Sequence, residues 1–184
     1  MNRGGHAKHG PLCFGHNGEQ ARALKICSMK YSRLTKEQFE ELQPEFVNFL
    51  ATQSITAQEW AQIKEDRPEV AQQELEVFSD LVWEGVLSKV EYLENISERH
   101  MHLFHLAKKE MKLFSVKVLN PAIDLRTHEG FGWFKRNFQS DFVEYLTASK
   151  AYGSDRNLDT FKLIEQGAVI TKGELFQWFE QIME

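Results

Sequence analysis

The chain has 184 residues, the usual size of one domain, and this length leaves hardly any room for a second. With 42% hydrophobic, 12% aromatic and 27% charged residues, its composition excludes disordered and fibrous classes. Residues 29–184 carry 18 basic and 26 acidic side chains, a net charge of −8. Because proteins bind duplex DNA mainly by placing Lys and Arg against phosphates, this acidic body argues against nucleic acid as a partner.

The cysteines and the apolar runs bear on the cellular compartment. The two cysteines are Cys13 and Cys27, so residues 29–184 cannot build a disulfide framework or a thiolate metal site. Apolar runs are only a few residues long, whereas a membrane-spanning helix needs about 18 apolar residues. The N-terminal part also lacks the apolar stretch of a secretory signal. We therefore expect a cytoplasmic protein with no membrane partner.

Residues 1–28 differ in composition from the rest of the chain. They hold five of the 11 glycines and three of the seven histidines, without a helical or strand period. Such a segment buries too little apolar surface to offset the entropy of ordering, so we expect a disordered extension before a true start at Met29. The alternative is a zinc site, because four side chains have the spacing of zinc ligands. These are His6, His9, Cys13 and His16. Residues 29–184 are expected to form a single domain.

The first part of this domain has helical signals. Amphipathic spacing predicts a helix from about residue 35 to about residue 53, and Pro44 should kink or divide it, with residues 45–52 as the second piece. A short helix should then end before Pro68, which suits the first position of a third, longer helix. Two capping boxes mark the starts of the first two helices: Thr35 with Gln38, and Thr56 with Glu59.

The third helix separates apolar from acidic side chains. The apolar residues that should line one side are Val70, Val77, Phe78, Leu81, Val82 and Val86. Another side carries an acidic strip of Glu76, Asp80 and Glu84. Since this strip lacks the Glu-x-x-His pattern of a di-iron site, we expect it to be a solvent-exposed helix face.

After the third helix the apolar period changes from about 3.6 towards 2, which indicates strands. Two alternating runs on either side of Lys108-Lys109 predict an antiparallel hairpin near residues 99–118. Further strands are expected over residues 90–96 and 142–149.

The last part of the chain returns to helical signals. Thr127 can cap a helix, residues 158–166 have a helical pattern, and Thr171 with Glu174 predicts a capping box for a last helix. The fold class is therefore α+β: N-terminal helices, then a small antiparallel sheet, with further C-terminal helices.

Several phrases of the sequence resemble a known but uncharacterised protein family. The phrases are MKYSRLTKEQFEEL, FLATQSITAQEW, SDLVWEGVLSKVEYL, TASKAY and FKLIEQGAVITKGELF. They resemble a family of small, single-domain bacterial proteins of unknown function, over nearly all of residues 29–183. The resemblance implies a cytosolic housekeeping or accessory protein, and it carries over no site residue.

Common catalytic devices are missing from the sequence. There is no complete Gly-rich dinucleotide or phosphate loop, no Gly-x-Ser-x-Gly elbow and no His-Glu-x-x-His motif. We therefore favour a protein that is not an enzyme and needs no cofactor, without excluding catalysis.

One cluster in the hairpin has the residue types of a ligand site. His100 and His102 point to the same face of their strand, and a two-residue turn at Lys108-Lys109 places them opposite Lys117 and Ser115. Two imidazoles can bind a metal, for which Glu94 or His128 would be a third ligand. Because the ammonium of Lys117 repels a cation and attracts an anion, a small anionic ligand is the sharper hypothesis. An ordinary half-exposed polar face is the alternative, and no metal is expected.

The last helix has a broad apolar face. Its candidate interface residues are Leu175, Trp178, Phe179 and Ile182. This face either docks on the chain's own sheet or stays partly open, as a contact for a second copy or another protein. The leading function is thus a non-enzymatic interaction or accessory module, and the alternative is a protein that binds a small anion or a metal through its strand histidines.

Overall fold

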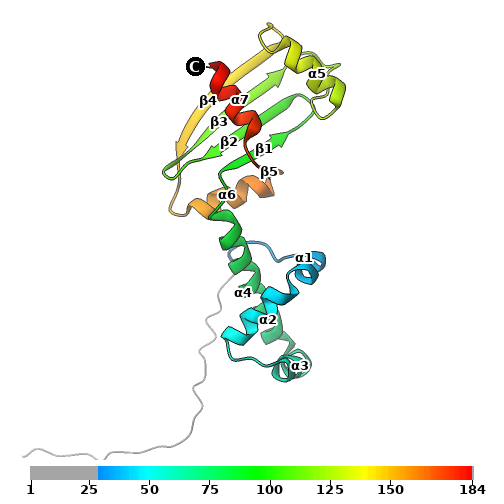
Figure 1. Cartoon of the computed structure of the whole chain (residues 1–184), viewed down its shortest axis with the longest axis vertical. Helices are drawn as coiled ribbons and strands as arrows, with labels where there is room; N and C mark the ends of the chain where they lie inside the picture. Colours follow the sequence, from blue (N-terminus) through cyan, green and yellow to red (C-terminus); the bar gives the residue numbers. More distant parts are fainter. Residues whose placement is uncertain (1–28, 184) are drawn as a thin grey trace, which may run out of the picture.

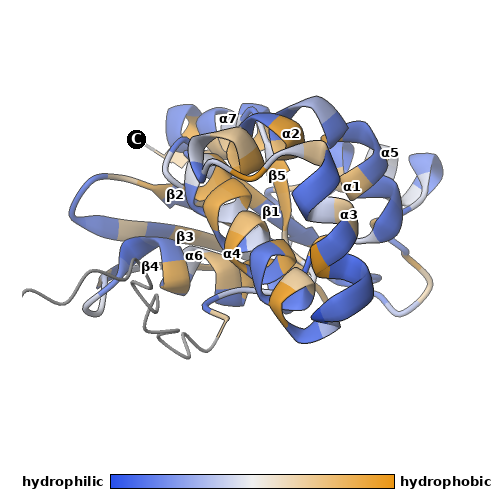
Figure 2. Cartoon of the chain, turned by 90° about the horizontal axis from the view of Figure 1, so that it is seen from below, coloured by the Kyte–Doolittle hydropathy of each residue, from blue (hydrophilic) through white to orange (hydrophobic). Residues whose placement is uncertain are grey.

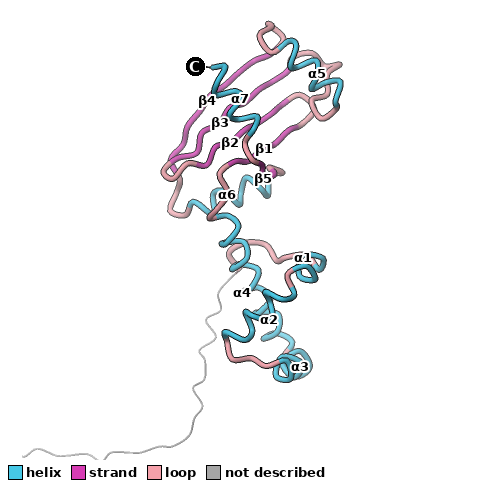
Figure 3. Tube along the Cα trace, in the orientation of Figure 1, coloured by secondary structure: helices cyan, strands magenta, loops and turns pink. Residues whose placement is uncertain are grey.

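The computed structural model describes residues 29–183, so the extension and its alternative zinc site lie outside the described residues. The described chain contains seven helices and a five-stranded antiparallel sheet, which confirms the α+β class. Residues 29–89 form a helical arm and residues 90–183 form a sheet unit (Figure 1). Figure 3 shows that the strands are confined to the sheet unit.

The arm consists of four helices: α1 (Lys36–Glu41), α2 (Gln43–Thr52), α3 (Ala57–Asp66) and α4 (Pro68–Leu87). Both predicted capping boxes form, at Thr35 and at Thr56. Pro44 divides the first predicted helix as expected, because it lies in the first turn of α2, where its missing N–H has no intrahelical acceptor to lose. Pro68 begins α4, also as predicted.

Aromatic rings hold the short helices against α4. The ring of Phe78 on α4 lies 5.1 Å from that of Phe46 and 5.4 Å from that of Phe49, measured between centroids. Val77, Leu81 and Val86 on the same helix remain exposed. The apolar side of this helix is therefore only partly buried, because α2 and α3 cover only part of α4.

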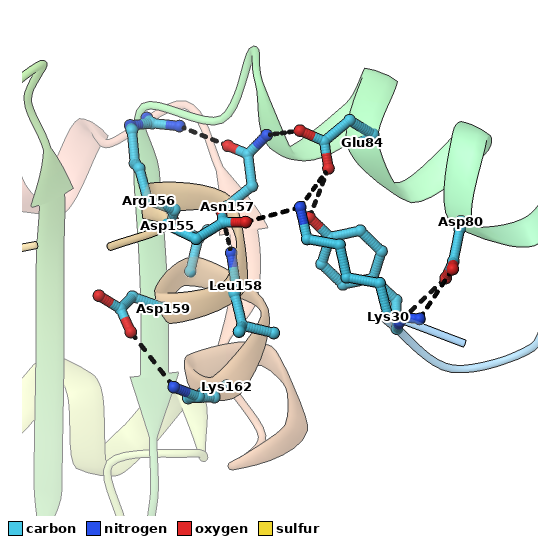
Figure 4. A network of polar contacts seen from close by, with 11 residues as sticks. Lys30, Asp80, Glu84, Asp155, Arg156, Asn157, Leu158, Asp159 and Lys162 are labelled. Atoms are coloured by element: carbon cyan, nitrogen blue, oxygen red, sulfur yellow. Dashed lines mark hydrogen bonds and ion pairs between the residues drawn. The ribbon is translucent and has the colours of Figure 1, made fainter. Parts of the chain in front are cut away.

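The acidic strip of α4 holds the segment that precedes α1 (Figure 4). The Asp80 carboxylate accepts hydrogen bonds from the backbone N–H groups of Lys30 and Tyr31, at 2.7 and 2.9 Å. Glu84 accepts from the Lys30 ammonium at 2.9 Å and from the Tyr31 hydroxyl at 2.6 Å. The acidic face is thus partly exposed, as Glu84 shows, but its carboxylates also bind a segment far away in the sequence, which the sequence did not indicate.

The sheet unit contains strands β1 (Tyr92–Ile96), β2 (His100–Leu106), β3 (Glu110–Val118), β4 (Val143–Ala151) and β5 (Val169–Thr171). Their order is β4-β3-β2-β1-β5, and every neighbouring pair is antiparallel. The β2–β3 hairpin has the predicted register, with His100 opposite Lys117 and His102 opposite Ser115. A two-residue turn therefore suffices to predict which side chains share a face.

Helices α5 (His128–Asn137) and α7 (Glu174–Met183) cover one face of the sheet, and α6 (Arg156–Glu165) covers one end of the other face. The core under α5 and α7 includes Met101, Leu103, Phe134 and Phe179, all fully buried. The rest of the opposite face, called here the open face, carries the side chains of His100, His102, Ser115, Lys117 and Leu146.

The predicted capping box of the last helix does not form. Thr171 ends strand β5, where its hydroxyl donates to Glu94 and accepts the N–H of Gly173. Gly173 has a φ of 76°, and a Cβ there would fall 2.2 Å from the ring of Tyr92. The turn into α7 thus depends on this glycine.

Arg156 joins the arm to the sheet unit. Its guanidinium donates to three backbone carbonyls, those of Leu87 at 2.9 Å, Val90 at 2.6 Å and Leu106 at 3.1 Å. The neighbouring Asp155 binds the Lys30 ammonium at 2.7 Å, which links α6 to the segment held by α4 (Figure 4). The end of α4, the end of β2 and the start of α6 therefore meet at one polar joint.

Candidate functional site

The histidine cluster lies on the open face of the sheet. The His102 Nδ1 atom is 3.0 Å from the Ser115 hydroxyl, and the rings of His100 and His102 stack with centroids 6.1 Å apart. Burial of His102, together with the nearby His100, lowers the pKa of His102 below its ordinary value. The structure thus brings the predicted residues onto one face, with an imidazole that tends to stay neutral.

Lys117, the fourth predicted residue, already has a partner. Its ammonium lies 2.9 Å from the carboxylate of Glu144, which strand β4 places directly opposite. This pairing neutralises the cation that the anion hypothesis requires, and it brings a negative charge to the same face.

The metal alternative gains no further ligand from the described residues. Within residues 29–183, no group of three His, Cys, Asp or Glu side chains is placed to hold a metal ion. Glu94, a predicted third ligand, sits opposite Leu103 on the face covered by α7. His128 lies at the start of α5, also on that side of the sheet.

The candidate interface residues of the last helix are divided between core and surface. Phe179 is fully buried, with its ring 6.0 Å from those of Phe134 and Tyr145. Trp178 is half-buried and packs edge-on against Phe138. Leu175 also packs on this core, whereas Ile182 is 40% exposed. Docking on its own sheet therefore occupies most of this face, and the last turn stays open.

A groove between α2 and α4 is the second feature with the shape of a binding site. It has a volume of about 500 Å³ and a predominantly apolar lining. From α2 the lining residues follow helical spacing, as do those from α4, so each helix presents one face to the groove. They are Glu45, Asn48, Phe49 and Thr52 from α2, and Phe78, Leu81, Val82, Gly85, Val86 and Lys89 from α4 and its end. Figure 2 shows apolar residues along α4.

The groove continues towards the sheet unit. A second hollow of about 590 Å³ shares Val86 and Lys89 with the groove and extends to Ile170 of strand β5. Leu81 in the groove is 57% exposed, and Ile170 at the far end is also exposed. The hollow therefore extends from the arm to the edge of the sheet, with apolar residues at both ends and Lys89, Glu91 and Lys172 among its lining.

Charge is distributed unequally between the two parts. Residues 29–89 carry 12 acidic and six basic side chains, a net charge of −6. Residues 90–183 carry 13 acidic and 12 basic ones, a net charge of −1. The groove thus lies in the part of the described chain that holds nearly all of the net negative charge.

Comparison with known proteins identifies a family. The model of a family of unknown function, DUF6495, matches residues 29–184. The chain belongs to this family. The resemblance seen in the sequence is thereby confirmed, and the DUF6495 match leaves out residues 1–28. Searches of the curated proteins and of the solved structures found no match.

Sequence patterns in this DUF6495 chain missed the groove. The signal was present, since the apolar residues of α4 are spread over more of its circumference than one covering layer can bury. Nothing in the sequence shows, however, which of these residues α2 and α3 leave uncovered. Among the described helices of the DUF6495 chain, none has the length and apolar character needed to cross a membrane.

Proposed function

We propose that this protein is a non-enzymatic interaction module whose α2–α4 groove binds a basic, amphipathic helix of a partner protein. The observation that carries the proposal is the open apolar groove itself, in which Leu81 is 57% exposed beside the buried ring of Phe78. Grooves between two helices are a common receptor for the apolar face of a third helix.

Gly85 supports a helix as the occupant. A glycine inside a helix lowers stability by roughly 1 kcal/mol relative to alanine. Gly85, within the 20-residue α4, is therefore expected to have a specific role. A Cβ at Gly85 would meet no atom within 4 Å, so packing inside the described chain does not require a glycine. Close approach of a partner backbone along the groove does require a small residue there.

The charge of the arm supports a basic partner. The net charge of −6 over residues 29–89 attracts Lys and Arg on the polar face of an incoming helix. The groove itself is lined by one acidic residue, Glu45, and one basic residue, Lys89. The attraction for a basic helix therefore comes from the net charge of the whole arm. Because exposed charges are screened, the affinity should fall as salt is added.

A designed peptide provides the test. The probe is a helical peptide of Leu and Lys with leucines at i, i+3, i+4 and i+7, compared with the same peptide carrying Glu for Lys. Gly85→Leu fills the groove without changing the charge, and we expect it to weaken binding of the basic peptide by about tenfold or more. The matched control is Gln72→Leu, at an exposed position of α4 outside the groove.

Calorimetry distinguishes the outcomes. Binding of the basic peptide that Gly85→Leu reduces and Gln72→Leu preserves would support the proposal. Equal binding of the basic and acidic peptides, equal loss in both variants, or no binding at all would contradict it.

The histidine cluster remains the second candidate, as a site for a small anion. The bond between His102 and Ser115 favours it, because it orients one ring on an accessible face. The pairing of Lys117 with Glu144 weighs against it, so the groove leads.

A further inference from the structure

Strand β4 is a long and uncovered edge of the sheet. It pairs with β3 along all nine residues from Val143 to Ala151, and among the described residues no strand lies on its other side. Residues 146–151 are all exposed, including Leu146 at 57%. At the other edge β5 has only three residues. Proteins usually shorten, bulge or interrupt such an edge, because its free N–H and C=O groups pair with any strand that fits.

The hydrogen-bond pattern shows which backbone groups of β4 are free. The N–H of Leu119 donates to the carbonyl of Phe142 at 2.8 Å, just beyond the end of the β3–β4 ladder. Since bonded residues alternate along an antiparallel pair, the even-numbered residues of β4 direct their backbone groups at β3. The odd-numbered residues therefore direct theirs outwards, and Thr147 is the middle one.

We propose that two copies of this chain pair edge to edge through β4, antiparallel and centred on Thr147, so that their sheets join into one. The three central pairs of outward-facing residues then exchange both backbone hydrogen bonds across the junction. At each end the carbonyl of Val143 accepts from Ala151 of the second copy, because the Val143 N–H already donates to Ser140 at 3.0 Å. The two copies show the same face of the sheet on the same side, because odd residues pair with odd residues. The junction is isologous, as expected for a closed two-fold dimer.

The charges of β4 select this register. When Thr147 lies opposite Thr147 of the second copy, Glu144 lies opposite Lys150 of the second copy, and the same pair recurs on the other side of the two-fold axis. Opposite charges at such positions stabilise strand pairing. Centring the junction on Leu146 or Ala148 instead breaks both ion pairs and shortens the ladder. The strand is thus complementary to itself in the register that uses all of its length.

The end of α7 lies at the same edge. This helix starts beside Tyr92 of β1, and its residue Phe179 packs on Tyr145 of β4. The last turn, with the exposed Ile182 and Met183, therefore reaches the β4 side of the sheet (Figure 1). A second copy would cover these side chains, so the exposed part of the predicted α7 interface would contact the second copy.

Sedimentation velocity on the full chain tests the dimer. Lys150→Glu places like charges opposite each other twice, so we expect the dimer dissociation constant to rise by about tenfold or more. Lys64→Glu on α3 makes the same charge change far from β4 and should leave the constant unchanged. A wild-type chain that stays monomeric, or a dimer that tolerates Lys150→Glu, would overturn the proposal.

Cysteine cross-linking tests the register. The background carries Cys13→Ser and Cys27→Ser, and a single cysteine is then introduced on β4. Thr147→Cys puts the two Cα atoms about 5.5 Å apart, within the range of a disulfide. Ser149→Cys separates them by more than about 10 Å, so it serves as the matched control. We expect a disulfide dimer from the first variant only, and equal cross-linking of both would contradict the register.

Discussion

The helical arm and the sheet unit bury their apolar surface to different degrees. In the sheet unit, α5 and α7 lie on one face, and side chains such as Leu103, Phe134 and Phe179 lose all contact with solvent. In the arm, three short helices face one long helix, and exposed apolar side chains remain along α4. We therefore expect the sheet unit to supply most of the stability, whereas the arm leaves apolar side chains of α4 exposed.

The two parts also differ in how they carry charge. Acidic and basic groups nearly balance in residues 90–183, whereas residues 29–89 have twice as many acidic as basic side chains. Like charges concentrated in one part oppose its compaction. The difference implies that the arm opens locally at a lower free energy than the sheet unit, as weakly buried elements generally do.

The largest expected effect is on the core of the sheet unit. Phe179→Ala removes a fully buried ring that contacts Phe134 and Tyr145, and it should lower the free energy of unfolding by about 3–5 kcal/mol. Ile182→Ala, one turn further along α7 at a 40% exposed position, should cost less than about 0.5 kcal/mol. Urea unfolding followed by circular dichroism measures both. Similar losses for the two variants would show that this core does not provide most of the stability of the sheet unit.

A smaller effect is expected at the joint between the two parts. Arg156→Ala leaves the carbonyls of Leu87, Val90 and Leu106 without their shared donor, which should cost about 1–3 kcal/mol. Hydrogen exchange should then speed up most at the end of α4. Arg126→Ala, which removes only exposed ion pairs, is the control and should leave exchange in α4 unchanged. Unchanged exchange in α4 would argue against the joint as the element that couples arm and sheet.

The smallest effect is a pH dependence of the segment held by α4. Hydrogen bonds from the Lys30 ammonium and the Leu158 N–H lower the pKa of Asp155, and those from the Tyr31 hydroxyl and Lys30 lower the pKa of Glu84. A carboxyl whose pKa is lower in the folded state contributes stability above its unfolded pKa, near 4, and loses it as the pH falls through the folded value.

Because these groups are partly exposed, we expect the contribution to stay below about 1 kcal/mol. Asp155→Asn should reduce the loss of stability on acidification below pH ~4, relative to Asp66→Asn at the exposed end of α3. Urea midpoints measured across this range check the prediction. An identical pH dependence in both variants would contradict the role of Asp155.

Local signals in the sequence predicted local structure well. The capping residues Thr35 and Thr56 mark helix starts that depend on a few neighbouring residues. The hairpin register followed from the two-residue turn, because alternation along a strand then fixes every pair.

Contacts between distant segments could not be predicted in this way. Glu144 neutralises Lys117 because β4 joins the sheet beside β3, and nothing within the hairpin indicates that register. Glu76 pairs with Arg33 for a similar reason, since the segment before α1 returns to α4. Thr171 has the spacing of a capping residue, yet pairing with β1 makes it part of a strand. In each case a partner far along the chain outweighs the local pattern.

The length of α4 has a consequence for any bound partner. At 1.5 Å per residue, its 20 residues span about 30 Å in one piece. Arg156 fixes the end of α4 to the sheet unit, so the length of this helix sets the distance between the groove and the sheet unit. A partner helix bound in the groove as proposed would lie at a set distance and direction from the β4 edge, so only an assembly with matching spacing would bind both surfaces at once.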